Sequence, residues 1–446
     1  MTLVRPTTPA ARLVVRGARV LDPRSDVNGT FDVLVVDGAI ASLAPAGSAT
    51  VPEGAEVVDG AGRHLLPAFV DPHVHLRVPG QEHKEDLETG TRAAAAGGYC
   101  AVVAMPNTDP VVDSAPILRA LRDAAARDAR VPVAFTASIT RGLRGEELTE
   151  MAELRSEGAI AFTDDGRPVV SAGMMRKALQ YQRLAGGVLA LHDEDPALSG
   201  AGAMHEGEVS ALLGVAGIPS VSESTMVARD CALAGYERGR IHVQHLSCME
   251  SVLAVEAAKA SGVQVTCEAS PHHLCLTEEA VRGLDTRMKM NPPLRTEDDR
   301  QALIEGLRSG VIDCIATDHA PHARDEKEVP FEQAPMGTTG LETAFAAVYT
   351  QLVVPGVLDL GLVVERMTGG GEPFGIPAPR VQVGQEANLV LVDLDAQWEV
   401  GEDGYESRSE NCCFAGRRLR GRVLLTVADG GVAYRERAFS VVGASG

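Results

Sequence analysis

His73 and His75 are separated by one residue in the segment from Val70 to Arg77. In an extended strand, residues two apart point to the same face, so both imidazoles can converge on one metal ion. The apolar run from Leu65 to Val70 precedes them and is typical of a buried strand in a parallel sheet. We therefore expect the pair at the carboxyl end of such a strand. A single His-x-His is a weak signal, so the prediction depends on further ligands elsewhere.

Further polar residues follow other apolar runs in the same way. They include histidines, aspartates and an asparagine: Asn107, Asp164, Asp165, His192, His245, Asp318, His319 and His322. With the first pair, six of the twelve histidines stand at predicted strand ends. Histidines scattered through a core or over a surface would not be expected to follow that rule, so these residues are candidates for one shared site.

The chemistry of this set is that of a metal-dependent hydrolase. Imidazoles combined with carboxylates suit Zn²⁺ or a related divalent ion, and the set is large enough for two ions. Two metals about 3.5 to 4 Å apart share a hydroxide whose pKa is lowered towards neutrality. Such a hydroxide attacks a polarised carbonyl while a nearby carboxylate carries the proton. The pattern predicts hydrolysis of an amide, or its reverse.

The elements that must position these residues are repeated β/α units between residues 65 and 380. After the first strand, apolar strands are predicted at residues 99–105, 131–138, 159–163, 188–191, 241–244, 263–267 and 311–317. Helical patterns such as 113–128 and 173–184 separate them. Eight such units predict a (β/α)₈ barrel, whose active sites lie at the carboxyl ends of the strands.

The two ends of the chain have a different pattern. Residues 1–64 and 381–446 contain short apolar runs broken by turn residues, among them the hairpin signal Asp37-Gly38. Neither set of strands is large enough to bury a core alone. We therefore predict one small β-sandwich built from both ends, beside a barrel domain at 65–380.

Composition excludes several classes of protein. The chain has 446 residues, is 45% hydrophobic and carries a net charge of −20 without a basic block, which argues against binding to nucleic acid or an anionic membrane. No secretory apolar segment follows Met1, and no long apolar run occurs, so we expect a cytoplasmic protein. The eight cysteines form no C-x-x-C pair and are expected to be buried thiols.

Five segments resemble those of bacterial type I dihydroorotases in the amidohydrolase superfamily: residues 70–77, 105–108, 161–166, 291–295 and 316–322. The resemblance covers nearly the whole chain, including the flanking β-domain. It implies zinc-dependent, reversible cyclisation of N-carbamoyl-L-aspartate to (S)-dihydroorotate in pyrimidine biosynthesis. It is also compatible with a homodimer and with a complex with aspartate transcarbamoylase.

The resemblance assigns roles to individual residues. It implies that His73, His75 and Asp318 bind one zinc, that His192 and His245 bind the other, and that Asp165 and a hydroxide bridge the two. Asp318 would also be the catalytic acid and base. The substrate-binding residues that it implies are His75, Arg77, Asn107, Asn291, His322, Met336 and Gly337. Arg77 suits a substrate carboxylate because guanidinium binds carboxylates with two parallel hydrogen bonds.

The bridging position departs from the pattern of many relatives, which use a carboxylated lysine at the end of the fourth strand. None of the five lysines stands there, so Asp165 takes the position, chosen over Asp164 on the family's spacing. A short aspartate reaches less far, which favours weaker binding at the second metal site. Asp164 is expected to cap the turn that follows it.

Two other functions stay open at this point. One is a related cyclic amidase, such as a dihydropyrimidinase, hydantoinase or allantoinase; the missing lysine and the presence of Arg77 count against the first two. The other is a non-catalytic dihydroorotase-like subunit of an aspartate transcarbamoylase assembly, which the complete ligand set disfavours.

Structural roles are also weighed for individual residues. Arg77 could be an ion-pair partner and Asn107 a turn residue. His272 and His273 are expected to be buried packing residues, and His319 to support the site through hydrogen bonds. Residues 325–328 are charged, and we expect them to be mobile.

Overall fold

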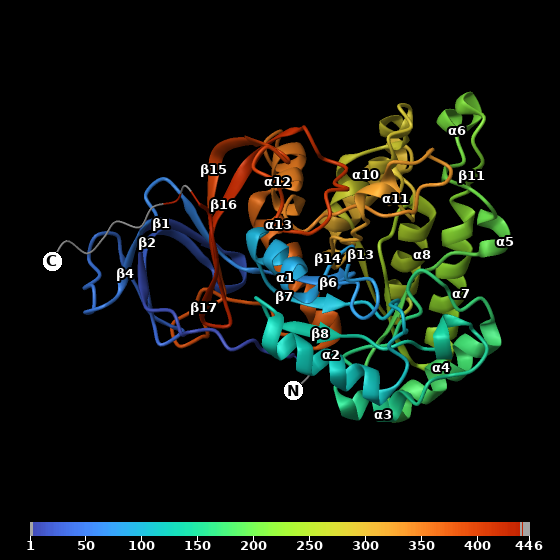
Figure 1. Cartoon of the computed structure of the whole chain (residues 1–446), viewed down its shortest axis with the longest axis horizontal. Coiled ribbons are helices and arrows are strands. Elements are labelled where there is room, and N and C mark those ends of the chain that lie inside the picture. The colour runs from blue at the N-terminus through green and yellow to red at the C-terminus, as the bar shows by residue number, and fades with distance from the viewer. Residues whose placement is uncertain (1–2, 438, 440–446) are drawn as a thin grey trace.

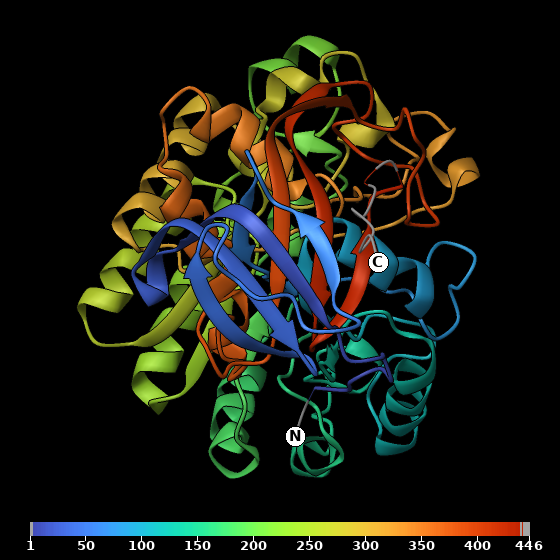
Figure 2. The same cartoon turned by 90° about the vertical axis from the view of Figure 1, so that its left-hand side faces the viewer.

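The structure is a computed structural model that describes residues 3–437 and 439. Eight strands from both ends of the chain join in one sheet: β1 (Leu13–Asp22), β2 (Val27–Val36), β3 (Ala39–Pro45), β4 (Glu56–Asp59), β5 (His64–Pro67), β15 (Leu389–Glu399), β16 (Arg418–Ala428) and β17 (Gly431–Arg435). Their order is β17-β16-β15-β5-β1-β2-β3, with β4 paired to β1. This β-domain lies at one end of the molecule, left of the barrel in Figure 1 and facing the viewer in Figure 2.

The predicted hairpin at Asp37-Gly38 is confirmed. Val36 of β2 pairs with Ala39 of β3, and the two residues between them have φ angles of 49° and 79°. Positive φ at both positions is the geometry of a type I′ turn, which matches the natural twist of paired strands.

The two ends of the chain share one apolar core. Leu13, Val15 and Val33 from the N-terminal strands pack in the same cluster as Leu389 and Leu425 from the C-terminal strands. All five side chains are almost fully buried. The prediction that both ends build one small β-sandwich domain is therefore confirmed.

The barrel strands are parallel to one another. They are β6 (Phe69–Val74), β7 (Tyr99–Ala104), β8 (Val133–Phe135), β9 (Leu189–Leu191), β12 (Arg240–Val243), β13 (Gln264–Ala269) and β14 (Cys314–Ile315). Phe162 makes parallel bridges to Ala137 and Leu189, and Val74 makes one to His319. These bridges connect β8 to β9 and β14 to β6. The sheet therefore closes into the predicted barrel, with the fourth strand reduced to the backbone around Phe162.

The apolar run before His73 is divided between the two domains. Leu65 of β5 pairs with β1 and β15 and lies in the sandwich core, whereas Phe69 begins β6 and lies in the barrel core. Our interpretation of the run as a single strand was wrong. Both cores are apolar, so hydrophobicity alone does not mark where the chain passes from one to the other.

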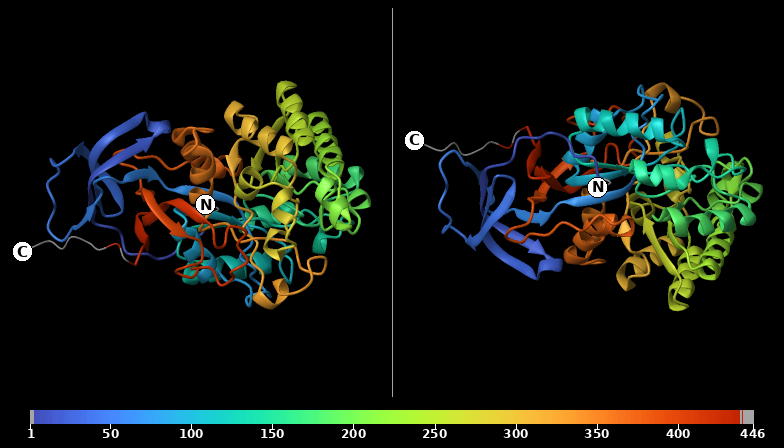
Figure 3. Two further views of the ribbon diagram at one scale, coloured as in Figure 1. Left: turned by 90° about the horizontal axis from the view of Figure 1, so that it is seen from above. Right: turned by 90° about the horizontal axis from the view of Figure 1, so that it is seen from below.

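Helices surround the barrel strands (Figure 3). The longer ones are α1 (Leu87–Ala96), α2 (Ala115–Asp128), α3 (Met151–Glu157), α4 (Ala172–Ala185), α7 (Val221–Glu237), α8 (Met249–Ala260), α10 (Glu297–Ser309) and α13 (Leu360–Thr368). The predicted helices at 113–128 and 173–184 correspond to α2 and α4. Among residues 3–437 and 439, no helix has the length and hydropathy needed to cross a lipid bilayer.

Shorter elements lie in the connections between barrel strands. The helices are α5 (Pro196–Ser199), α6 (Glu208–Leu213), α9 (Pro271–Cys275), α11 (Arg324–Lys327) and α12 (Ala344–Val348), and a small parallel pair is formed by β10 (Met204–His205) and β11 (Gly217–Ile218). Single 3₁₀ turns occur at residues 23–25, 141–143, 278–281, 286–288 and 369–374, and a π-helical turn at 349–353. Several of these segments contribute residues to the barrel mouth.

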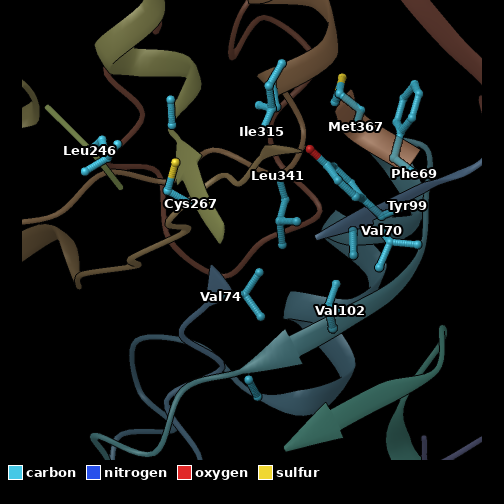
Figure 4. Close-up of a cluster of buried hydrophobic side chains, with 14 of the residues drawn as sticks. Phe69, Val70, Val74, Tyr99, Val102, Leu246, Cys267, Ile315, Leu341 and Met367 are labelled. Carbon is cyan, nitrogen blue, oxygen red and sulfur yellow. The ribbon is translucent and has the colours of Figure 1, made fainter. Parts of the chain in front are cut away.

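Aromatic packing fixes the first two barrel strands against each other (Figure 4). The ring of Phe69 lies edge-on to Tyr99, with ring centres 5.7 Å apart, and is stacked on Phe345 at 5.3 Å. Such pairs add to the free energy of burying the rings themselves. The eight cysteines are all free and buried, as predicted. The buried barrel core thus lies below the polar residues at the barrel mouth.

Candidate metal centre

Six residues with metal-binding side chains meet at the carboxyl ends of the barrel strands. His73 is in β6 and His75 follows it, while Asp165, His192, His245 and Asp318 follow the fourth, fifth, sixth and eighth strand positions. All six are buried, with exposed fractions of 7% or less. The barrel therefore brings together every residue that the sequence suggested as a ligand.

The first group is formed by His73, His75, Asp165 and Asp318. Nε2 of His73 is 3.5 Å from Oδ1 of Asp165 and 3.5 Å from Oδ1 of Asp318. Nε2 of His75 is 3.1 Å from Oδ1 of Asp318 and 3.6 Å from Oδ2 of Asp165. Atoms bound tetrahedrally to one zinc ion at about 2.1 Å lie about 3.4 Å from one another. The spacing of the group thus fits a small divalent cation.

His73 provides the clearest sign that the group accommodates an ion. Its Nε2 atom is buried and has no hydrogen-bond partner among the described residues. A buried polar atom without a partner is costly and calls for a specific explanation. A metal ion between His73, Asp165 and Asp318 would satisfy it.

The second group is formed by Asp165, His192 and His245. Oδ1 of Asp165 is 3.7 Å from Nδ1 of His192 and 3.9 Å from Nε2 of His245. The two imidazole nitrogens are 2.9 Å apart. Asp165 therefore belongs to both groups, because its Oδ1 faces His73 of the first group and both histidines of the second.

Electrostatic interactions keep the carboxylates of Asp165 and Asp318 ionised. Burial alone would raise the pKa of Asp165, but the neighbouring imidazoles outweigh it and hold this pKa well below its usual value. The pKa of Asp318 is lowered in the same way, against its burial, by His73 and His75. An ionised carboxylate is the form that binds a divalent cation.

The backbone at the site has an unusual conformation. Arg77, His245 and Asp318 have φ angles of 60°, 29° and 49°, in the left-handed region that residues with a side chain rarely adopt. Such conformations cost free energy and cluster at functional sites, where the surrounding structure enforces them. Here they occur where the chain turns out of the barrel strands.

Arg77, His322, Met336 and Gly337 form one side of the site. Nε of Arg77 donates to the carbonyl of Pro321 at 3.0 Å, and its Nη2 is 3.4 Å from Nε2 of His322, which is 2.9 Å from the carbonyl oxygen of Met336. Gly337 has a φ angle of 139°, and an added Cβ would come within 3.0 Å of His322 Nε2. Only glycine fits at this position.

Arg77 does not form a structural ion pair. In the part of the chain that the structure describes, no carboxylate oxygen lies within 4.0 Å of its guanidinium, although its exposed fraction is only 9%. Burial lowers the pKa of Arg77 to about 10, so the group remains charged at neutral pH. A buried guanidinium without an anionic partner is suited to bind an anionic ligand.

The two asparagines contact ligands of both groups. Oδ1 of Asn107 accepts from Nδ1 of His75 at 2.9 Å, and its Nδ2 donates to Oδ2 of Asp165 at 3.0 Å. Asn291 donates to Oε2 of Glu194 at 2.5 Å, and the same oxygen is 3.2 Å from Nε2 of His192. Asn107 is thus more than a turn residue, because its side chain orients two residues of the first group.

Two glutamates of the site were missed by the sequence analysis. Glu194 contacts His192 and Asn291, and Glu268 is 2.8 Å from Nδ1 of His73. Both could have been found by the rule used for the histidines, because Glu268 is the first residue after the predicted strand 263–267, and Glu194 stands three residues after the strand 188–191. The rule was applied to histidine, aspartate and asparagine, and not to glutamate.

Two expectations about neighbouring residues were wrong. Asp164 does not cap the turn after it: its Oδ1 accepts from the backbone N–H groups of Ile139 and Thr140, at 2.8 and 3.0 Å. It holds the segment after β8, which is distant in sequence. Residues 325–328 are also held in place, because Lys327 is buried in α11 and donates to the carbonyls of Thr286, Lys289 and Pro335.

Of the other histidines, His272 and His273 behave as expected. His272 and His273 are buried, and His273 bonds to the carbonyl of Pro292 at 2.9 Å. His319 accepts from the backbone N–H of Gly340 at 3.2 Å and faces Glu85 at 3.3 Å. It supports the loop that carries Asp318 without facing the two groups.

A closed parallel barrel with buried histidines and aspartates at its mouth defines a metal-dependent hydrolase of the amidohydrolase type. A family model described as dihydro-orotase-like matches residues 62–251. The dihydroorotase of Pelotomaculum thermopropionicum is 45% identical over 96% of this chain and 99% of its own length. That of Anaeromyxobacter sp. (strain K) is 46% identical over 95% of this chain and 98% of its own. The chain belongs to the dihydroorotase family.

Solved structures show how widely the fold is shared. The L-hydantoinase of Arthrobacter aurescens superposes with a TM-score of 0.84 at 26% identity, covering 97% of this chain and 98% of that one. The dihydropyrimidinase of Brevibacillus agri reaches 0.82 at 22% identity, covering 96% of both chains. The predicted fold and the resemblance to dihydroorotases are confirmed, and with them an enzyme of pyrimidine biosynthesis. The ligand groups also indicate a bound metal.

Proposed function

We propose that this enzyme holds two zinc ions per subunit and interconverts N-carbamoyl-L-aspartate and (S)-dihydroorotate. The observation that carries the proposal is the position of Asp165 between two groups of donors. Small groups of nitrogen and carboxylate donors favour zinc over calcium or magnesium, which prefer six or more oxygens.

The proposed ligands are His73, His75 and Asp318 for one zinc and His192 and His245 for the other, with Asp165 between them. When bound, zinc polarises a carbonyl oxygen and lowers the pKa of water. Both effects are what hydrolysis or formation of a cyclic amide requires. The second ion is expected to bind more weakly, because its group offers three donor side chains.

Asp318 is the proposed proton carrier. Its ionised carboxylate lies against His73 and His75 at the mouth of the barrel. In ring closure it accepts the proton of the ureido nitrogen as that nitrogen attacks the side-chain carboxyl carbon, and one carboxyl oxygen leaves as water. In hydrolysis a water adds to the ring carbonyl carbon, and Asp318 returns the proton to the departing nitrogen. Its lowered pKa means that the carboxylate is ionised at neutral pH and has oxygens free to accept a proton.

Arg77 is the proposed partner of the ring carboxylate of dihydroorotate. Its charge is buried and has no anionic partner among the described residues, and the backbone at Met336 and Gly337 approaches closely. Asn107 and Asn291 would complete the pocket from the side of the two ligand groups. Dihydrouracil and hydantoin lack this carboxylate, so the charge favours dihydroorotate over them.

The test is turnover of dihydroorotate by the purified protein, beside dihydrouracil, hydantoin and allantoin, before and after removal of zinc by a chelator. We expect turnover of dihydroorotate alone, lost on chelation and restored by zinc. Turnover of hydantoin or dihydrouracil at a comparable rate would contradict the proposed role of Arg77. Full activity after complete zinc removal would contradict the metal centre.

The proposed partners need separate measurements. A homodimer and a complex with aspartate transcarbamoylase stay predictions from the family resemblance. Sedimentation of the protein alone, and mixed with that enzyme, tests both. A monomer at micromolar concentration, or no co-sedimentation, would contradict the respective prediction.

A further inference from the structure

Glu268 in β13 lies directly beneath the proposed metal ligands. Its exposed fraction is 0%, and its carboxylate makes three contacts with histidine residues. Oε1 is 2.8 Å from Nδ1 of His73 and accepts from the backbone N–H of His245 at 3.2 Å, while Oε2 is 2.9 Å from Nε2 of His242. A charged group at this depth is stable only when its oxygens are satisfied.

We propose that Glu268 is a positioning residue that orients one ligand of each metal group, His73 in the first and His245 in the second. The inference rests on the proposed two-zinc function. Glu268 does not face the reacting atoms itself, so it would act only through the two histidines.

The contact with His73 sets the tautomer of that ring. A proton on Nδ1, donated to Glu268, leaves the lone pair of Nε2 free. Nε2 is the atom that faces Asp165 and Asp318 at 3.5 Å and has no hydrogen-bond partner among the described residues. Carboxylates that bond to the far side of a ligating imidazole raise its basicity and fix its orientation.

The contact with His245 fixes a strained piece of backbone. His245 has a φ angle of 29°, and Glu268 holds its N–H through the side chain. The backbone carbonyl of Glu268 also accepts from the N–H of Leu246 at 2.9 Å. Residues 245 and 246 are thus bound to Glu268 by two hydrogen bonds, which set the direction in which the imidazole of His245 leaves the strand.

His242 anchors the carboxylate from below. Its Nε2 faces Glu268, and its Nδ1 is 2.8 Å from the hydroxyl of Thr266. Burial alone would raise the pKa of Glu268. His73 and His242 outweigh this effect and lower the pKa to about 2, so the carboxylate is charged at neutral pH. Both carboxylate oxygens of Glu268 are therefore held by hydrogen bonds.

The same residues could instead form a third metal site, because His242, Glu268 and Cys314 lie close enough to share an ion. The hydrogen bonds argue against it, because both nitrogens of His242 and both oxygens of Glu268 already have partners. Burial also raises the pKa of the Cys314 thiol well above its usual value. These residues therefore fit a role in positioning the metal ligands better than a third metal site.

The test is the zinc affinity of Glu268→Gln, measured by competition with a chelator in the absence of substrate. The amide removes the negative charge behind His73. Its nitrogen cannot accept, so either the contacts to His73 and His245 are lost or His242 must change tautomer to keep its contact. We expect zinc to bind about 10- to 100-fold more weakly, as for other carboxylates behind ligating histidines. The visible spectrum of the cobalt-substituted protein should shift as well, because the ligand field at His73 changes.

Glu223→Gln is the matched control. Glu223 in α7 is also a buried glutamate, and it accepts from the N–H of Ser247 at 3.0 Å and from the hydroxyl of that residue. It contacts none of the proposed ligands. This variant should lose stability but keep the zinc affinity and cobalt spectrum of the wild type.

The possible outcomes separate the inference from the function on which it rests. Wild-type zinc affinity and an unchanged cobalt spectrum in Glu268→Gln would overturn the inference. A third zinc ion that the wild type binds and Glu268→Gln does not bind would also overturn it. Wild-type protein that binds no zinc would overturn the metal centre itself. If Glu268→Gln does not fold, Thr266→Val decides: it removes only the hydroxyl that fixes His242, and we expect zinc to bind a few-fold more weakly, whereas unchanged affinity would contradict the inference.

Discussion

Buried carboxylates occur in both domains, but their partners differ. In the β-sandwich, Asp22 accepts from the backbone N–H groups of Arg24 and Val381, and Asp32 from those of Gly17 and Ala49. At the barrel mouth, Asp165 and Asp318 lie against imidazoles instead. In the first case the carboxylate fixes a turn, and in the second it contributes to a charged cluster able to hold metal.

The direction of a pKa shift does not distinguish the two roles. The pKa of Asp32 is lowered as well: burial would raise it, but the backbone hydrogen bonds outweigh that effect. The pKa of Asp165 is lowered by imidazoles, against the same opposing burial. The partner atoms therefore identify the function, whereas the shift alone only shows that the carboxylate is stabilised in its ionised form.

Asp318→Asn should have the largest effect on catalysis. The amide cannot take up a proton, so we expect turnover in both directions to fall about 10²- to 10⁴-fold, the usual contribution of a general acid and base. Steady-state rates at saturating zinc measure this. Turnover within tenfold of wild type, with bound zinc, would show that another group carries the proton.

Arg77→Met should separate substrate binding from metal binding. We expect zinc content to stay at the wild-type level and the KM for dihydroorotate to rise about 10- to 100-fold, since a buried charge-assisted contact contributes about 1.5 to 3 kcal/mol. His73→Ala is the comparison, because it should lose zinc and activity together. Equal loss of zinc in both variants would contradict the division of roles.

Asp32→Asn should act on stability alone. The amide keeps one acceptor but replaces the other with a donor, so one backbone N–H loses its partner, at a cost of about 1 to 3 kcal/mol. Chemical denaturation measures the loss, and kcat and KM should match those of the wild type. A clear change in kcat would show that the sandwich influences the site.

Glu342→Gln should have a small effect that depends on pH. Burial raises the pKa of Glu342 to about 7 from its usual 4.5, although its carboxylate accepts from the backbone N–H groups of Glu406 and Ser407. The folded state then binds the extra proton between these pH values, so wild-type stability falls as pH rises through about 7.

The neutral amide avoids this loss. The melting temperature of Glu342→Gln, relative to wild type, should therefore be a few degrees higher at pH 8 than at pH 5. A difference that does not change with pH would show that Glu342 is charged in the folded protein throughout this range.

Much of the fold could be predicted because each barrel strand is an apolar run followed by polar residues. The fourth strand was predicted at 159–163, yet only Phe162 makes bridges there, because pairing depends on neighbours that are distant in sequence. The passage from β5 to β6 was missed for a similar reason: Leu65 and Phe69 are both apolar and belong to different cores.

The residues of the site also include some that the sequence predicted and some that it did not. The histidines and aspartates were recognised because they follow strands and match family motifs. Lys327 was assigned to a mobile charged segment, and nothing near it in sequence indicates that carbonyls at positions 286, 289 and 335 surround its ammonium group. Contacts that only the tertiary fold creates are those that local patterns do not reveal.

The most direct test of the central claim is the location of zinc by anomalous diffraction at the zinc absorption edge, in crystals of the zinc-loaded protein. We predict two peaks, one among His73, His75 and Asp318 and one beside His192 and His245, each within about 2.2 Å of an oxygen of Asp165. A peak between His242 and Cys314, or peaks that do not contact Asp165, would contradict it.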